Sequence, residues 1–264
     1  MVCAFSDSSQ PFNGFQRAYI VYGSRLVLLV LGFYSIEMKR SPVTAPTIIC
    51  NHVSWIDILA VIVALGDIPV FVSKKGVLDV PLVSFIARKS NAILVDSKMD
   101  ACSASTTLPL SNSSTVAISH YQRFRPSLVP LVIFPEGTTS NGRGLMEFRS
   151  GAFLSGTPVQ PLAISYDYTY TSPSWESIPM SVHLFDMFTQ VYQSLSMTIL
   201  PAIEPSSAET ITFKLQCQSA LANALHVPVV NGTVDDKLLL HQKIRAGKLS
   251  YVIDLPARHP PPLQ

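Results

Sequence analysis

A histidine and an aspartate stand close together in the segment NHVSWID, residues 51–57. His52 follows one apolar run, and Asp57 lies at the start of the next. In a continuous helix, side chains five residues apart differ by about 500° of rotation and point well apart. The two side chains can therefore meet if His52 precedes the helix and Asp57 lies in its first turns.

A pair of this kind has the chemistry of a general base. A neutral imidazole can take a proton from a hydroxyl, while a carboxylate on the other ring nitrogen orients the ring and stabilises the charge that forms. Taken alone the spacing is a weak signal, because many unrelated sequences contain it. The sequence has no GxSxG nucleophile segment, and Cys50 belongs to an apolar run, which favours a buried, inert thiol over a nucleophile.

A second segment of interest is FPEGTTSNG, residues 134–142, which contains glycines and hydroxyl side chains directly after an apolar run. Loops of this composition present backbone N–H groups that can hold phosphate or hydroxyl oxygens. An ordinary surface turn would explain the glycines but gives no reason for Glu136 beside them. The segment is therefore a candidate binding loop.

Short apolar runs alternate with helix-like segments, which predicts an α/β fold. The expected helices cover 56–65, a segment near 81–87, and a segment up to about 225 that begins with a capping box of Ser206 and Glu209. The Ser- and Thr-rich segment 102–115 is expected to be an exposed loop. Strands are expected at 47–50, 70–73, 92–95, 131–134, 159–166 and 197–200.

Composition indicates a protein that meets lipid. The 264 residues are 48% hydrophobic and 14% charged, well below the roughly 25% charged residues of soluble domains. A net charge of +2 gives no reason to expect nucleic acid as a partner. The four cysteines are widely spaced, which favours reduced thiols over a disulfide framework or a zinc site.

The strongest membrane candidate is the apolar run from Ala18 to Ile36, which contains Arg25. An arginine at mid-bilayer costs roughly 2.5 to 3.5 kcal/mol, so an interfacial or re-entrant helix competes well with a full span. An ordinary buried helix remains a further alternative. We therefore expect an N-terminal segment, residues 1–40, with a membrane-associated helix, a folded domain over 41–254, and a disordered Pro-rich tail over 255–264.

Together, the two polar segments resemble the glycerolipid acyltransferase family. NHVSWID is similar to that family's NHxxxxD motif and FPEGT to its second motif, in the family's order; FRSGAF (148–153) extends the resemblance, which runs from about Thr47 to Tyr166. The resemblance implies one mixed-sheet acyltransferase domain with helices on both faces. PSWES (173–177) resembles the lysophospholipid branch of the family.

The resemblance also implies roles for individual residues. His52 would be the general base and Asp57 would orient it. Glu136, Gly137 and Thr138 match the acceptor-binding motif. We expect the amides of Gly137 and Thr138 to face a phosphate, and Glu136 to bind a hydroxyl or brace the loop.

One position departs from the family pattern. Ser97 stands where the family usually has an arginine, and the neighbouring Lys98 lacks the planar fork that grips phosphate with two hydrogen bonds. Arg149 matches a basic position of the family and is a further candidate for anion contact. Other candidates are Lys74, Lys75 and Arg143, each of which could equally be a solvated surface residue.

The resemblance implies acyl transfer from acyl-CoA, as co-substrate, to the free hydroxyl of a lysophospholipid, with no cofactor and no metal. The expected partners are membrane lipids and no nucleic acid, and the expected location is the endoplasmic reticulum membrane with the active site facing the cytosol. Three alternatives remain open: a lysophosphatidic acid or glycerol-3-phosphate acyltransferase, an acyl-CoA thioesterase, and a non-catalytic lipid-binding relative.

Overall fold

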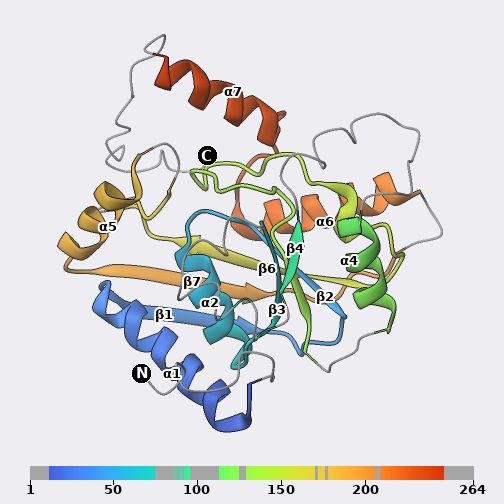
Figure 1. Ribbon diagram of the computed structural model, residues 1–264, viewed down its shortest axis with the longest axis horizontal. Helices are drawn as coiled ribbons and strands as arrows, with labels where there is room; N and C mark the ends of the chain where they lie inside the picture. The colour runs from blue at the N-terminus through green and yellow to red at the C-terminus, as the bar shows by residue number, and fades with distance from the viewer. Residues whose placement is uncertain are drawn as a thin grey trace.

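The computed structural model describes residues 12–74, 87, 90, 92–95, 113–124, 129–169, 172–175, 178–205 and 209–246. Within these ranges a seven-stranded sheet forms, with the strand order β1-β7-β6-β2-β5-β3-β4 (Figure 1). Neighbouring strands are parallel except β6 and β7, which are antiparallel. The strands are β1 (Phe33–Arg40), β2 (Thr47–Cys50), β3 (Val70–Lys74), β4 (Ile93–Val95), β5 (Leu131–Ile133), β6 (Val159–Tyr166) and β7 (Gln193–Ile199).

Helices cover both faces of this sheet. Successive residues of β2 point to opposite faces: Ile48 packs in a core cluster with residues of α1 and α2, and Ile49 packs in another with residues of α4 and α6. Both residues are fully buried, which explains why β2 reads as a continuous apolar run. The helices are α1 (Gly14–Val30), α2 (Ile56–Leu65), α4 (Ser113–Phe124), α5 (Met180–Thr189), α6 (Thr210–Leu225) and α7 (Val234–Arg245), with a short 3₁₀ helix, η4 (Ser150–Ala152).

The topology brings the two polar segments together. β2 lies between β5 and β6 and runs parallel to both, so the carboxyl ends of all three strands meet at one edge of the sheet. NHVSWID follows β2 and FPEGTTSNG follows β5. In open α/β sheets, ligands bind outside this edge. The fold therefore places both candidate segments at the expected location of a site.

The predicted single α/β domain with a mixed sheet is confirmed, and the predicted helix over 56–65 is α2. Two local predictions are wrong. α4 begins at Ser113, inside the segment expected to be a loop. α6 begins at Thr210, so Glu209 is its N-cap and not a residue of its first turn as expected, while Ser206 lies outside the described residues. The expected helix near 81–87, apart from residue 87, and the tail over 255–264 lie outside the described residues.

The apolar run Ala18–Ile36 does not form one membrane helix. α1 ends at Val30, Gly32 takes a positive φ of 88°, and β1 then pairs with β7 at the edge of the sheet. A side chain at residue 32 would meet the backbone of Gln190, so glycine is required at this turn. Among the described helices, none combines the length and apolar character needed to cross a bilayer. Periodicity alone could not separate helix from strand in this apolar run.

Candidate active site

His52 and Asp57 meet, as their spacing predicts. The loop after β2 carries His52, α2 begins at Ile56, and the Nδ1 of His52 lies 2.8 Å from Oδ2 of Asp57. The Asp57 side chain is fully buried and that of His52 is 18% exposed. Because an ionised carboxylate can accept but not donate, this hydrogen bond places the proton on Nδ1 and leaves Nε2 as an acceptor.

Asp57 is held by other donors besides His52. The backbone N–H groups of Val53 and Ser54 donate to Oδ2, at 2.6 and 2.9 Å. The hydroxyl of Tyr166, at the end of β6, donates to the second oxygen, Oδ1. These donors replace the hydrogen bonds that water would make to an exposed carboxylate.

Phe134 supports the imidazole of His52. The two rings stack with their centroids 4.1 Å apart and their planes 20° apart. The stacking contact holds one face of the imidazole, and the Nδ1 hydrogen bond to Asp57 holds one edge. Within the described residues, the structure provides no group of three or more histidine, cysteine, aspartate or glutamate residues placed to hold a metal ion.

Glu136 joins the two motifs instead of opening toward solvent. Its Oε1 accepts a hydrogen bond from the backbone N–H of His52, and its Oε2 accepts one from that of Met146, both at 3.1 Å. Its side chain is buried, and burial raises the pKa of the carboxyl from 4.5 to about 7, although these two hydrogen bonds act in the opposite direction. Of the two roles considered for Glu136, this geometry fits the brace.

Gly137 is needed for the shape of the second motif. It has a φ of 69°, and an added Cβ would lie 2.8 Å from the Nε of Arg149, so the guanidinium lies directly against the turn. The backbone N–H of Gly137 donates to the carbonyl of Phe134. This amide is therefore committed to the turn and does not face a phosphate, contrary to expectation. Arg149, the candidate for anion contact, lies beside this turn.

Lys237 brings a second cation to this loop, from a helix that no sequence signal connected with the site. Its Nζ donates to the carbonyl of Thr139 at 2.5 Å. Lys74 ends β3 at the same edge of the sheet, and Arg143 lies on the exposed continuation of the loop. Ser97, Lys98 and Lys75 lie outside the described residues.

A third segment crosses the site, and it includes the Trp175 of PSWES. The backbone N–H of Trp175 donates to the carbonyl of Val53, and its own carbonyl accepts from the hydroxyl of Thr139, so Trp175 bonds to both motif loops. His183 of α5 is buried, stacks on Trp175 and lies 3.5 Å from the hydroxyl of Ser54. Burial lowers the pKa of this imidazole. His183 is thus a buried neighbour of the loop that carries His52.

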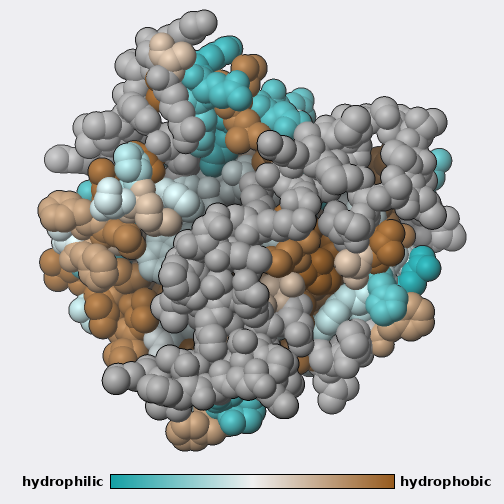
Figure 2. All heavy atoms as spheres, viewed as in Figure 1, coloured by the Kyte–Doolittle hydropathy of each residue, from teal (hydrophilic) through white to brown (hydrophobic). Residues whose placement is uncertain are grey.

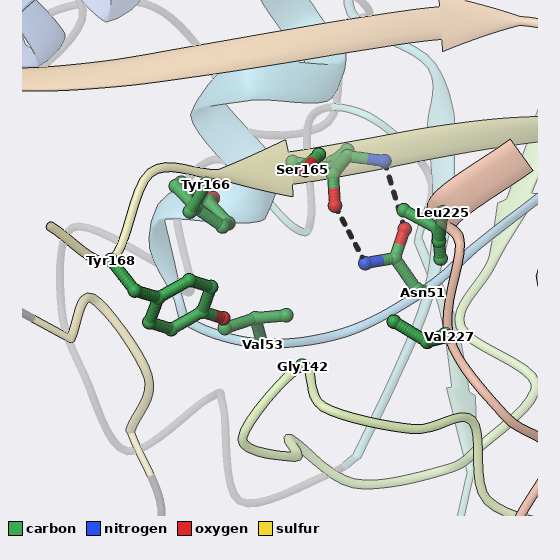
Figure 3. A pocket seen from close by; sticks show the side chains of 9 residues that line it. Asn51, Val53, Gly142, Ser165, Tyr166, Tyr168, Leu225 and Val227 are labelled. Carbon is green, nitrogen blue, oxygen red and sulfur yellow. Dashed lines mark hydrogen bonds between the residues drawn. The ribbon is translucent and has the colours of Figure 1, made fainter. Parts of the chain in front are cut away.

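Asn51 anchors the first motif to the sheet. Its side-chain amide donates to the carbonyl of Ile164 and accepts from the same residue's N–H, at 2.8 and 2.9 Å, so it continues the pairing of β2 with β6 (Figure 3). A pocket of about 30 Å³ lies beside it, lined in part by Val53, Tyr166 and Tyr168. That volume suits one or two water molecules and is far too small for a lipid.

Comparison with known proteins shows the family of the chain. Residues 38–165 match the family model described as Acyltransferase. The chain is 30% identical to the lysophospholipid acyltransferase LPEAT1 of Arabidopsis thaliana, over 95% of this chain and 70% of that protein. It is 26% identical to human lysophosphatidylcholine acyltransferase 2, over 94% of this chain and 46% of that protein. The chain thus spans less than half the length of the latter relative.

The fold has a solved counterpart. The crystal structure of the 1-acyl-sn-glycerophosphate acyltransferase PlsC from Thermotoga maritima superposes with a TM-score of 0.55 at 15% identity, covering 79% of this chain and 77% of that one. The chain therefore belongs to the glycerolipid acyltransferase family, and the acyltransferase class predicted from its two motifs is confirmed.

Proposed function

We propose that the protein transfers a fatty acyl group from acyl-CoA to the free hydroxyl of a lysophospholipid, with His52 as the general base. The observation that carries this proposal is the His52–Asp57 hydrogen bond, which keeps Nε2 available as a proton acceptor at the carboxyl edge of the sheet. The names of the relatives support the acceptor class, because they are described as lysophospholipid and lysophosphatidylcholine acyltransferases.

The proposed reaction needs no covalent enzyme intermediate. Nε2 of His52 takes the proton of the acceptor hydroxyl as its oxygen attacks the thioester carbonyl. The tetrahedral intermediate then collapses, the carbon–sulfur bond breaks, and the imidazolium returns the proton to the leaving sulfur. Asp57 stabilises the positive charge on His52 between these steps. The products are the diacyl phospholipid and free CoA.

Two cations from other segments lie against the second motif. Arg149 lies against the Gly137 turn and Lys237 reaches Thr139 on the same loop. We propose that this region, with Thr138, holds the phosphate of the acceptor, and that Lys74 and Lys98 also contribute to anion contact. A phosphodiester carries one negative charge and a phosphate monoester nearly two. Ser97 stands where the family usually has an arginine, whose forked guanidinium binds phosphate. The loss of affinity is greater for the monoester, so a lysophospholipid with a head group is the favoured acceptor.

Initial rates test this choice of acceptor. With one acyl-CoA, we expect faster transfer to lysophosphatidylethanolamine or lysophosphatidylcholine than to lysophosphatidic acid or glycerol-3-phosphate. The Ser97→Arg variant should raise relative activity toward the two monoesters. A strong preference of the wild-type protein for either monoester would contradict the proposed acceptor.

We also propose that the protein lies on a membrane through an apolar surface that includes α1. Phe15, Tyr19, Tyr22, Leu26 and Val30 recur every three or four residues, so they share one side of the helix, and each is between 50 and 74% exposed. Aromatic and aliphatic side chains on one helical side suit the interface between lipid head groups and acyl chains.

α5 extends this apolar surface. Phe185, Phe188 and Val191 are 63 to 83% exposed. Tyr192 links them to β1, the strand that follows α1, because its ring lies 6.4 Å from that of Tyr34 at the start of β1. Figure 2 shows apolar residues gathered on the side of the molecule where Figure 1 places α5 and the adjoining ends of β1 and β7. A bilayer on this surface would lie beside the helix that carries His183.

Vesicle sedimentation tests the membrane surface. Deleting residues 1–40 would also remove β1, so substitutions are the better test. We expect Tyr22→Ser with Leu26→Ser, and separately Phe185→Ser with Phe188→Ser, to lower binding to phosphatidylcholine vesicles at least about tenfold, since each buried apolar side chain is worth about 1.5 to 3 kcal/mol. Leu239→Ser on α7, also exposed, is the matched control. Unchanged binding of both double variants would contradict the proposed surface.

For location, we propose the endoplasmic reticulum membrane with the site facing the cytosol. Cys50 and Cys217 are buried free thiols, which is compatible with a reducing compartment. Protease protection of the tagged protein in sealed microsomes tests the orientation: digestion without detergent is expected, and full protection would contradict it.

A further inference from the structure

Tyr166 occupies a position at the site that neither motif contains. It is the last residue of β6, and its hydroxyl donates to Oδ1 of Asp57, whereas the N–H groups that bind Asp57 all donate to Oδ2. We propose that Tyr166 is a positioning residue that acts on His52 through Asp57. This inference rests on the proposed function, in which His52 is the base.

The surroundings of Asp57 show why the hydroxyl matters. The carboxylate is fully buried, and within the described part of the chain Tyr166 is the one donor to its Oδ1. A carboxylate bound at one oxygen alone can turn about its Cβ–Cγ bond. A donor at each oxygen fixes the carboxylate plane and so directs Oδ2 at the Nδ1 proton of His52.

Tyr166 is itself held firmly. Its side chain is 6% exposed, and its ring meets that of Phe33 edge to face, with centroids 5.9 Å apart. Burial raises the pKa of the phenol well above its usual value, and the negative charge of Asp57 raises it further, so the hydroxyl stays protonated. Other titratable groups that act on this cluster are Tyr168, Cys50 and Glu136, and Lys237 acts on Glu136 in turn.

The arrangement is a chain of hydrogen bonds from Tyr166 through Asp57 to His52. It links the end of β6 to the loop after β2, beside the two hydrogen bonds that the side chain of Asn51 makes with the backbone of the same strand. Tyr166 does not touch the reacting atoms in this arrangement. Its contribution is to orientation, so its removal should lower kcat and leave substrate binding nearly unchanged.

Tyr166→Phe tests the inference, because it removes the hydroxyl and keeps the ring against Phe33. Tyr168→Phe is the matched control, since its hydroxyl lies near the same pocket but donates to the carbonyl of Asn141. We expect kcat of Tyr166→Phe to fall about 10- to 100-fold, with both KM values within about twofold of wild type. The acid side of its pH–rate profile reports protonation of the base His52 and should move to higher pH, because a carboxylate that has lost a donor attracts the proton of His52 more strongly. Tyr168→Phe should match wild type in kcat, in both KM values and in its pH–rate profile.

A second measurement needs no turnover. Nitrogen-15 NMR of labelled histidine reports which ring nitrogen of His52 carries the proton, with His52→Ala identifying the signal. We expect the Nδ1-protonated form in wild type and in Tyr168→Phe, and a mixture of both forms in Tyr166→Phe. If the NMR result holds but no lysophospholipid is acylated, the proposed function fails and the positioning role stands. Wild-type kcat and pH profile for Tyr166→Phe, or an unaltered proton distribution on His52, would overturn the inference.

Discussion

The carboxylate of Glu136 accepts a hydrogen bond from the backbone N–H of His52 at 3.1 Å, although 84 residues separate the two in the sequence. The glutamate of one motif therefore holds the loop of the other. Its second oxygen binds the N–H of Met146, which keeps the carboxylate in place inside the protein. This bridge explains why an acidic residue stands in a loop proposed to bind phosphate: it faces inward, away from the anion.

The raised pKa of Glu136 predicts a pH-dependent stability. Because the pKa is about 7 in the folded protein and near 4.5 when unfolded, the folded state retains a proton that the unfolded state releases between these values. The stability contribution of Glu136 is thus fully present below about pH 4.5 and is lost as the pH rises through 7. The difference corresponds to about 3 kcal/mol. Urea unfolding followed by tryptophan fluorescence should show this loss in wild type and not in Glu136→Gln.

The exposed residue Glu204 provides the control for this experiment. Glu204→Gln should keep the pH dependence of wild type. If the free energy of unfolding falls by the same amount in Glu136→Gln and wild type between pH 5 and pH 8, the carboxyl of Glu136 is not the source of the pH dependence.

His52→Ala should abolish transfer while leaving the fold intact, since the side chain is partly exposed and lies on a loop. General-base catalysis is typically worth 10² to 10⁴ in rate, so a fall of about that size in kcat is expected, with an unchanged thermal unfolding midpoint. A variant with activity within about tenfold of wild type would show that His52 is not the base.

Asp57→Asn should be nearly as severe for a different reason. An asparagine can place its oxygen toward His52 and its amide nitrogen toward Tyr166, whose hydroxyl can turn to accept, so the loop should remain folded. The negative charge that stabilises the imidazolium is lost, and kcat should fall at least about 100-fold. If Asp57→Asn keeps the folded loop and the turnover of wild type, the charge of Asp57 has no role in catalysis and the residue only stabilises the start of α2.

Gly137→Ala and Gly66→Ala form a matched pair. Both glycines have a φ near 70°, so each alanine should destabilise the protein by about 1 to 2 kcal/mol. An added Cβ at Gly66 meets nothing within 4 Å, whereas one at Gly137 meets the guanidinium of Arg149. We expect Gly137→Ala alone to raise the acceptor KM, by about tenfold, through displacement of Arg149. Equal acceptor KM values for the two variants would show that Arg149 does not contribute to acceptor binding.

Much of the sheet could be predicted because its central strands are buried on both faces. Runs such as Thr47–Cys50 and Val159–Tyr166 are recognisable from composition alone, and the His52–Asp57 contact followed from the geometry at the start of a helix. β1 could not be predicted in the same way, because it pairs with β7, far along the chain, and its sequence continues an apolar run that begins in α1.

The missed residues of the site share one property. Tyr166, His183 and Lys237 reach it from β6, α5 and α7, which lie outside both motifs. Each contact depends on how those elements pack, and no local spacing encodes it. Of these three residues, Tyr166 was the most predictable from the sequence. Its strand was expected in the sheet, and parallel strands end at the same edge, where the site was expected.

The release of CoA from acyl-CoA, with and without lysophosphatidylethanolamine, tests the central claim most directly. The account predicts that CoA is released when the acceptor is present, in a one-to-one ratio with phosphatidylethanolamine, and that both products disappear in His52→Ala. CoA release at the same rate without acceptor would identify a thioesterase. No release with any lysophospholipid would identify a binding protein, and either result would contradict the proposed transfer.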